Sequence, residues 1–149
     1  RPGARITSEL GQVLLFAPRI TNAGTISTPG GQALLAAGER VFLATDPTVR
    51  GLMVEVAEGG TVTNEVVGRI LAERGNVTLA ALAINQNGRV SATTSVRVGG
   101  SIRLQARDSQ ATEVLTGVLP VTRGGVLTLG TGSTTLAFTP FLLVNIIQL

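Results

Sequence analysis

Apolar and polar residues alternate over short stretches of the chain. The clearest stretch is Ser101–Ala106, in which Ile102, Leu104 and Ala106 occupy every second position. Such alternation is typical of a strand with one buried face, because successive side chains of a strand point to opposite sides. We therefore expect these three residues to face a core, and the polar residues between them to face outward.

This stretch belongs to a recurring phrase of the form Gly-x-apolar-x-Leu-x-Ala. The phrase begins at Gly11, Gly31, Gly75 and Gly100, with a weaker copy at Gly125. The steps between these glycines are 20, 44, 25 and 25 residues. We interpret the step of 44 as two repeats, with a degenerate copy near Met53–Ala57. A fixed period in this range is typical of solenoid proteins.

A second recurring unit runs in phase with the first. It places an apolar residue two positions before Asn, then a turn with Gly, then Ile or Val. Its copies are Ile20–Ser27, Val62–Ile70 and Ile84–Ala92. Helix signals are poor, because Val, Thr and Ile are frequent and Gly or Pro interrupts every run. The two units together indicate repeats that each carry two or three short strands.

These patterns predict an all-β chain, specifically a right-handed parallel β-helix of five or six rungs of 20–25 residues. Residues 1–149 would form a single segment. Each strand would pair with the equivalent strand of the next rung, so that like residues lie over like. We expect Asn22, Asn64, Asn85 and Asn87 to form such amide ladders inside the turns, since Asn tolerates turn conformations and bonds locally. Glycan contacts are the alternative role for these residues.

Three stretches interrupt the repeat. Thr45–Gly51 contains Pro47, which has no N–H to donate, so we expect a loop or a sheet edge there. Arg107–Thr112 is predicted to be a longer turn. Residues 133–149 are predicted to add one more strand or an irregular apolar tail. Phe141–Ile147 is strand-prone and uncharged, and at an open end it would favour end-to-end self-association.

The composition excludes several kinds of chemistry. The chain has no Cys and no His, so disulfides, thiolate or imidazole metal sites and His-based acid–base catalysis are absent. We expect no metal and no cofactor. Aromatic residues make up 3% of the chain, whereas hydrophobic residues make up 44%. This composition suits a narrow core of stacked aliphatic side chains.

The charge is modest and dispersed. The chain has a net charge of +3, and all 12 basic residues are Arg. Because they form no cluster and few aromatic rings are available for stacking, we expect no nucleic-acid binding. No apolar run reaches the length of a membrane-spanning helix, and the first residues contain no apolar signal core.

Several phrases between Gly11 and Asp108 carry a family likeness. They are Ile20–Ile26, Gly30–Gly38, Ala83–Val90 and Gly100–Ala106. As a set they resemble large secreted bacterial proteins of the filamentous haemagglutinin type. Such proteins are exported by two-partner secretion through a dedicated outer-membrane barrel.

The resemblance implies a right-handed β-helix within an extended shaft that is secreted or held at the bacterial cell surface. It implies a structural or adhesive role in adhesion, aggregation or biofilm formation, or the shaft of a contact-dependent toxin delivery protein. The implied partners are the outer-membrane transporter barrel and a glycan or protein on a host or bacterial surface. The chain lacks the Asn-Pro pair typical of the family's secretion domains. We therefore expect a fragment of a much longer exoprotein, with the transporter-recognition site outside it.

An enzymatic alternative comes from polysaccharide lyases and hydrolases that share the β-helix. They use acidic clusters with Ca²⁺ or paired carboxylates on an outer face. The closest acidic group here consists of Glu55, Glu58, Glu65 and Glu73. We interpret these residues as solvated charges with Arg69 and Arg74 as neighbours, because no ligand-type spacing is present. We expect no enzyme activity.

A basic ribbon is the candidate binding site. Arg69, Arg89 and Arg103 are predicted to point outward from their strands. Placed over one another, they would bind sulfated or other acidic glycans, because guanidinium groups pair well with such anions. Solubility and protection of sheet edges are the alternative roles.

Overall fold

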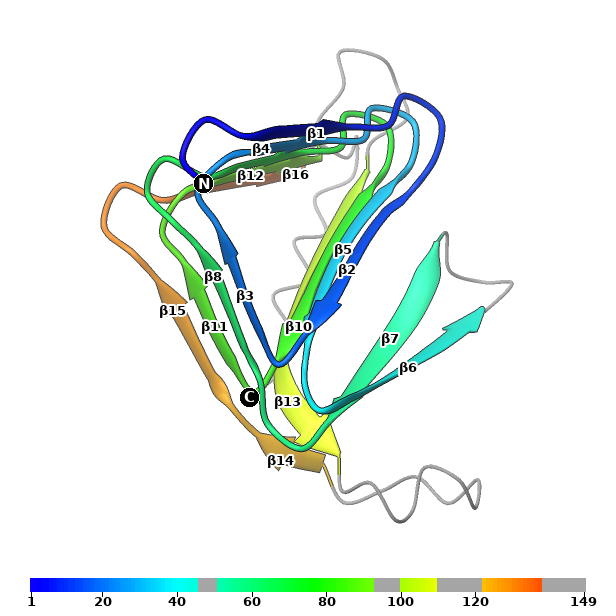
Figure 1. The fold of residues 1–149 in the computed structure, drawn as a ribbon, viewed down its shortest axis with the longest axis vertical. Coiled ribbons are helices and arrows are strands. Elements are labelled where there is room, and N and C mark those ends of the chain that lie inside the picture. The colour runs from blue at the N-terminus through cyan, green and yellow to red at the C-terminus, as the bar shows by residue number, and fades with distance from the viewer. Residues whose placement is uncertain (46–50, 93–99, 110–121, 138–149) are drawn as a thin grey trace.

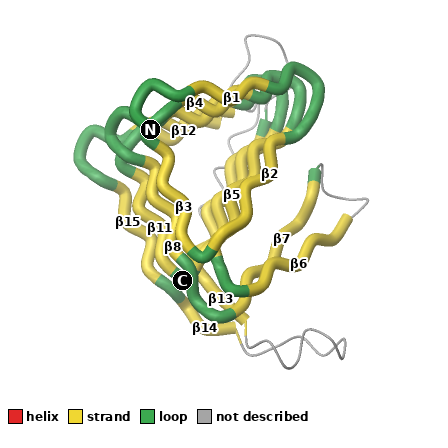
Figure 2. The backbone as a smooth tube through the Cα atoms, in the orientation of Figure 1, coloured by secondary structure: helices red, strands yellow, loops and turns green. Residues whose placement is uncertain are grey.

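The computed structural model describes residues 1–45, 51–92, 100–109 and 122–137. In these ranges the chain is all-β, with strands joined by turns and no helix. Three sheets enclose a common interior and give a three-sided outline when viewed down the stack (Figure 1). Figure 2 shows the same strands following one another in layers along that axis.

The five-stranded sheet consists of parallel strands only. In order across the sheet they are β1 (Arg5–Thr7), β4 (Thr25–Ser27), β9 (Arg69–Leu71), β12 (Arg89–Ala92) and β16 (Thr134–Ala137). The four-stranded sheet is also parallel. Its members are β3 (Arg19–Asn22), β8 (Thr61–Asn64), β11 (Ala83–Gln86) and β15 (Val126–Leu129).

The seven-stranded sheet is mixed. Its parallel part comprises β2 (Val13–Ala17), β5 (Gln32–Ala37), β10 (Asn76–Ala81) and β13 (Ser101–Ser109). The end of β13 pairs with β7 (Leu52–Ala57), which pairs antiparallel with β6 (Arg40–Thr45). A short strand, β14 (Thr122–Gly124), pairs antiparallel with β13.

The pairing joins equivalent residues of successive repeats, as the sequence predicts. In the seven-stranded sheet Leu79 is in register with both Leu35 and Leu104. In the four-stranded sheet Val62 is in register with Ile20 and Ile84. The prediction that strands pair between repeats is therefore confirmed for these two units.

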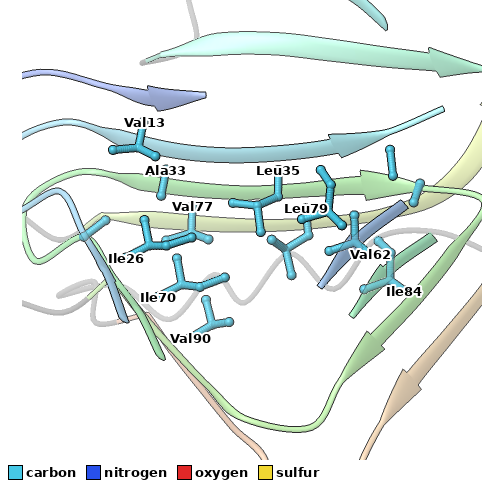
Figure 3. Packing of buried hydrophobic residues seen from close by; sticks show 14 of the residues in the cluster. Val13, Ile26, Ala33, Leu35, Val62, Ile70, Val77, Leu79, Ile84 and Val90 are labelled. Carbon is cyan, nitrogen blue, oxygen red and sulfur yellow. The ribbon is translucent and has the colours of Figure 1, made fainter. Parts of the chain in front are cut away.

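Aliphatic rows from all three sheets meet in the interior (Figure 3). Leu35 and Leu79 come from one sheet, Val62 and Ile84 from another, and Ile70 from the third. All five are fully buried. Each such side chain stabilises the fold by about 1.5–3 kcal/mol relative to an exposed one.

The glycine that opens the repeated phrase has a steric role. The backbone amide of Asn76 donates to the carbonyl of Gly31, which draws the two turns together. A Cβ atom at Gly75 would overlap this carbonyl, and one at Gly31 or Gly100 would overlap the carbonyl of the preceding glycine in the column. Only glycine permits this close backbone approach.

The step of 44 residues between Gly31 and Gly75 is one repeat with an insertion. Asn76 pairs directly with Gln32, so no further repeat lies between them. The intervening residues include the antiparallel hairpin β6–β7, which lies outside the three-sided stack (Figure 1). The interpretation of Met53–Ala57 as a degenerate copy is therefore wrong. In the described ranges four sets of three stacked strands follow β1, rather than five or six.

The hairpin covers the outer face of the seven-stranded sheet and builds a second apolar cluster. Val54 and Val56 of β7 pack there with Leu34, Ala36 and Ala80. Both faces of the sheet are therefore covered at β5 and β10, and every residue of these two strands is buried. This double burial explains why Gln32 and Asn76 lie in a dry environment although their positions point away from the main core.

The structure corrects two further sequence predictions and confirms a third. Val126–Leu129 pairs with β11, so the supposed phrase at Gly125 belongs to the four-stranded sheet. Arg107–Ser109 continues β13 instead of forming a turn, because it pairs with β14. The extra strand is confirmed at Thr134–Ala137. Residues 46–50, 110–112 and 138–149, for which a loop, a turn and an apolar tail are predicted, lie outside the described residues.

Candidate functional site

The three arginines of the predicted ribbon lie on two different sheets. Arg69 of β9 and Arg89 of β12 are register partners on the five-stranded sheet, and both are exposed. Arg5 lies in the same column, separated from Arg69 by Thr25. Arg103 lies on β13 in the seven-stranded sheet, opposite Thr78. The structure therefore brings Arg69 and Arg89 together and leaves Arg103 apart.

The two adjacent guanidinium groups have no carboxylate of the described residues within salt-bridge distance. Strands in a sheet lie about 4.8 Å apart, so the two cations repel each other at short range. An external anion placed between them would relieve this repulsion. Guanidinium forks donate paired hydrogen bonds to carboxylate and sulfate oxygens, so the pair suits an anionic group on a flat, accessible face.

The acidic residues considered for an enzyme site are dispersed. Glu55 is ion-paired with Arg107, and Glu58 with Arg40 at 3.1 Å. Glu65 and Glu73 lie in separate turns. Among the residues that the structure describes, no group of three or more potential ligands could hold a metal ion. Only Glu55 and Glu58 of these four carboxylates form ion pairs with described residues, and both lie on or beside the hairpin.

A buried amide ladder crosses three repeats of the four-stranded sheet. Asn22 donates from Nδ2 to Oδ1 of Asn64 at 2.8 Å, and Asn64 donates to Oε1 of Gln86 at 2.8 Å. Gln86 in turn donates to the carbonyls of Gly88 and Thr134, both at 3.1 Å. The ladder was predicted for Asn22 and Asn64, and this part is confirmed. The ladder ties turns of successive repeats together.

The third position of the ladder is Gln86, whereas the sequence predicts Asn85 and Asn87 there. Asn85 is half-buried and donates to Oγ1 of Thr63 at 3.3 Å on the other face of the sheet. The alternation along β11 carries the signal, because Gln86 lies two positions after the buried Ile84. The prediction for Asn85 is wrong because it relies on residue type, whereas Gln can fill the same position in the ladder.

Asp108 has a structural role that the sequence pattern did not indicate. Its carboxylate is 3% exposed and accepts hydrogen bonds from the backbone N–H of Gly59 at 2.9 Å and from Arg123 at 2.7 and 3.1 Å. The Arg123 hydrogen bonds, helped by Gly59, hold the pKa of Asp108 below its ordinary value, although burial acts in the opposite direction. Asp108 on β13 thereby links Gly59, which follows β7, to Arg123 on β14.

An apolar groove opens between the hairpin and β2. It has a volume of about 340 Å³ and is lined by Phe16, Ala17, Pro18, Gly38, Glu39, Val41 and Leu43. Phe16 and Leu43 are 46% and 43% exposed. Nothing in the local sequence pattern indicated this groove, because it depends on where the inserted hairpin docks.

The comparisons with known proteins add no relative. No family model matches the chain, and neither a curated protein nor a solved structure is significantly similar to it. Within the described ranges, no helical segment has the length and apolar character that a membrane crossing requires.

Proposed function

We propose that this chain is a segment of a right-handed parallel β-helix with a structural and adhesive role. In this proposal it forms part of the shaft of a large bacterial protein of the filamentous haemagglutinin type. The parent protein would be exported by two-partner secretion and act at the cell surface or after release. The transporter barrel would bind regions outside this chain.

One observation carries the proposal: equivalent residues of successive repeats pair in register on all three sheets. Leu35 pairs with Leu79, Val62 with Ile84 and Ile70 with Val90. Strands that pair with the next repeat build a quasi-one-dimensional object, in which each repeat contacts only its neighbours. Such a construction suits a load-bearing shaft whose outer faces present binding residues.

The described residues favour binding over catalysis. Two sets of buried polar groups have structural roles, namely the amide ladder and the hydrogen bonds around Asp108. The exposed arginine pair, Arg69 and Arg89, instead presents free donors on a flat sheet face. In this proposal Arg69 and Arg89 contact acidic surface glycans. Arg103 lies on another sheet and takes no part in this contact.

Adherence of chain-coated beads to cells tests this function. Beads carrying the purified chain should adhere to cultured epithelial cells more than albumin-coated beads do. Adherence should fall when the cells are treated with enzymes that remove sulfated and sialylated glycans. Equal adherence of both bead types would contradict the adhesive role. Adherence that persists after glycan removal would contradict glycan binding and indicate a protein receptor.

A further inference from the structure

The turn between β8 and β9 exposes two adjacent valines. This turn, Glu65–Gly68, is called the valine turn below; it lies at the corner between the four-stranded and five-stranded sheets (Figure 1). The side chains of Val66 and Val67 are 74% and 63% exposed. Turn positions favour Gly, Pro, Asn, Asp and Ser, whereas Val has a stiff, branched side chain that suits strands. The backbone of the turn therefore does not explain its residue types.

Backbone hydrogen bonds hold the valine turn in place. The N–H of Gly68 donates to the carbonyl of Glu65 at 2.8 Å and closes the turn. On one side the N–H of Glu65 donates to the carbonyl of Asn22 at 2.9 Å. On the other side the N–H of Arg89 donates to the carbonyl of Gly68 at 2.9 Å. The two valines are thus presented on a fixed base, so that a contact with them costs little conformational entropy.

Equivalent turns show that this corner does not require valine. Ala23–Gly24 and Asn87–Gly88 make the same connection with two residues fewer. Gly130–Ser133 has the same length as the valine turn and the same closing hydrogen bond, but it places Thr131 and Gly132 at its tip. Exposed apolar side chains cost free energy in water. A contact that covers Val66 and Val67 would recover this free energy.

Two cations lie beside the valine turn. Arg69 directly follows it, and Arg89 is the register partner of Arg69 in the next repeat. Both are exposed, and no carboxylate of the described residues lies within salt-bridge distance of either. Glu65 begins the turn and offsets part of this charge. Together these residues combine an apolar tip with a net positive charge.

This combination suits an anionic lipid surface. Apolar insertion and attraction between cations and anionic headgroups each give weak membrane binding alone, and their contributions add. A rigid sugar ring would cover little of a convex apolar tip, and a protein partner would need a complementary pocket. The boundary between headgroups and acyl chains accepts apolar side chains without such a pocket.

We propose that the valine turn and the arginine pair form a contact site for an anionic lipid membrane. Val66 and Val67 enter the boundary between headgroups and acyl chains, and Arg69 and Arg89 pair with lipid phosphate groups. The inference rests on the proposed function for the role of the arginine pair in binding anions. It adds a lipid as a second ligand and gives the two valines a role.

Vesicles without carbohydrate separate lipid binding from glycan binding. The probe is a vesicle of equal parts phosphatidylcholine and phosphatidylglycerol, and bound chain is measured by co-sedimentation. The parent chain should bind these vesicles and should bind vesicles of phosphatidylcholine alone much more weakly, because the latter carry no net charge.

Variants of the valine turn test the apolar part. Val66→Ser/Val67→Ser should lower the partition coefficient about tenfold, and Val66→Leu/Val67→Leu should raise it about tenfold, because each Leu adds one methylene group. Leu10→Ser/Val126→Ser is the matched control, since these two residues are 87% and 65% exposed and lie away from this corner. The control should bind like the parent chain.

The two ligands of the arginine pair are distinguished by heparin elution. Val66→Ser/Val67→Ser should elute from heparin like the parent chain although it loses vesicle binding. Arg69→Ser/Arg89→Ser should lose heparin binding and should also lower vesicle partition about tenfold. Vesicle binding that persists without heparin binding would contradict the glycan contact and support the lipid contact. Heparin binding without vesicle binding would contradict the lipid contact alone.

A fluorescent reporter locates the inserted residue. The chain has no Trp, so Val66→Trp introduces a single one. Its emission should shift to shorter wavelength when anionic vesicles are added, whereas the emission of Leu10→Trp should not change. Equal shifts of both reporters would contradict insertion at the valine turn.

Two further results would overturn the proposal. The first is equal vesicle binding by the parent chain and by a Val66→Ser/Val67→Ser variant whose circular dichroism and melting are unchanged. The second is self-association of the parent chain in the absence of lipid that this variant abolishes, because the valine turn would then contact a second copy.

Discussion

Nδ2 of Asn22 lies 2.8 Å from Oδ1 of Asn64, although 42 positions separate the two residues in the chain. Nδ2 of Asn64 in turn donates a hydrogen bond to Oε1 of Gln86 at the same distance. The ladder links three repeats through the last residues of β3, β8 and β11. Because both bonds lie in a dry interior, each amide depends on its neighbours for partners.

Removal of the central amide should therefore be costly. Asn64→Ala leaves the side chains of Asn22 and Gln86 without this partner, and each unsatisfied buried group costs about 1–3 kcal/mol. We expect the free energy of unfolding to fall by about 3 kcal/mol in urea titration. Asn85→Ala, on the outer face, should cost less than about 1 kcal/mol. Equal losses in the two variants would contradict the role of the ladder.

The glycine column makes a steric prediction. Gly75→Ala places a methyl group against the carbonyl of Gly31, so the two turns must separate. Overpacking of this kind costs about 1–3 kcal/mol, and the melting temperature should fall accordingly. Gly124→Ala is the control, because no atom lies near the position that its Cβ would occupy. A Gly75→Ala variant as stable as the Gly124→Ala variant would rule out the close approach.

Asp108 predicts a pH-dependent contribution to stability. Its folded-state pKa is lowered from the ordinary 3.8, so its stabilising effect is fully present above that value. The effect is lost as the pH falls through the lower, folded-state pKa. Asp108→Asn should reduce the free energy of unfolding at neutral pH by about 2 kcal/mol, since charged hydrogen bonds contribute that much. The difference from the parent chain should shrink progressively below about pH 4.

The control for Asp108 is the exposed ion pair between Glu58 and Arg40. Glu58→Gln should change stability by less than about 1 kcal/mol, because surface pairs are well screened. A stability difference for Asp108→Asn that stays constant from neutral pH down to strong acid would show that the carboxylate charge is not responsible.

The arginine pair predicts a difference between two equally charged double variants. Arg69→Ser/Arg89→Ser should elute from heparin at clearly lower salt than the parent chain. Arg19→Ser/Arg103→Ser should elute close to the parent, because its two positions lie on different sheets. Identical elution of both double variants would show that the binding to heparin depends on net charge alone, an effect that salt screens.

The all-β fold and the register of the repeated units could be predicted because they depend on local alternation and periodicity. Leu35, Leu79 and Leu104 each occupy the same place in the repeated phrase, and each pairs with the next. Asn22 and Asn64 were recognisable for the same reason. Stacking of equivalent positions turns a sequence period directly into contacts.

The hairpin could not be predicted in the same way. The insertion lengthens one repeat to 44 residues, close to twice the period, and the alternation in Leu52–Ala57 imitates a repeat strand. The groove, the second apolar cluster and the bonds of Asp108 all follow from where this hairpin docks. Arg103 was misplaced relative to Arg69 because alternation indicates an outward face without indicating which sheet.

Engineered cysteine pairs test the central claim most directly, since the chain has no Cys of its own. Thr63→Cys/Asn85→Cys joins register partners of successive repeats on an outer face. Arg69→Cys/Arg89→Cys does the same on the five-stranded sheet. Under mild oxidation both pairs should form intramolecular disulfides, because register partners lie within bonding range. Thr63→Cys/Ala83→Cys, displaced by two residues, should remain reduced. Oxidation of the displaced pair in preference to the register pairs would contradict stacking of equivalent repeats.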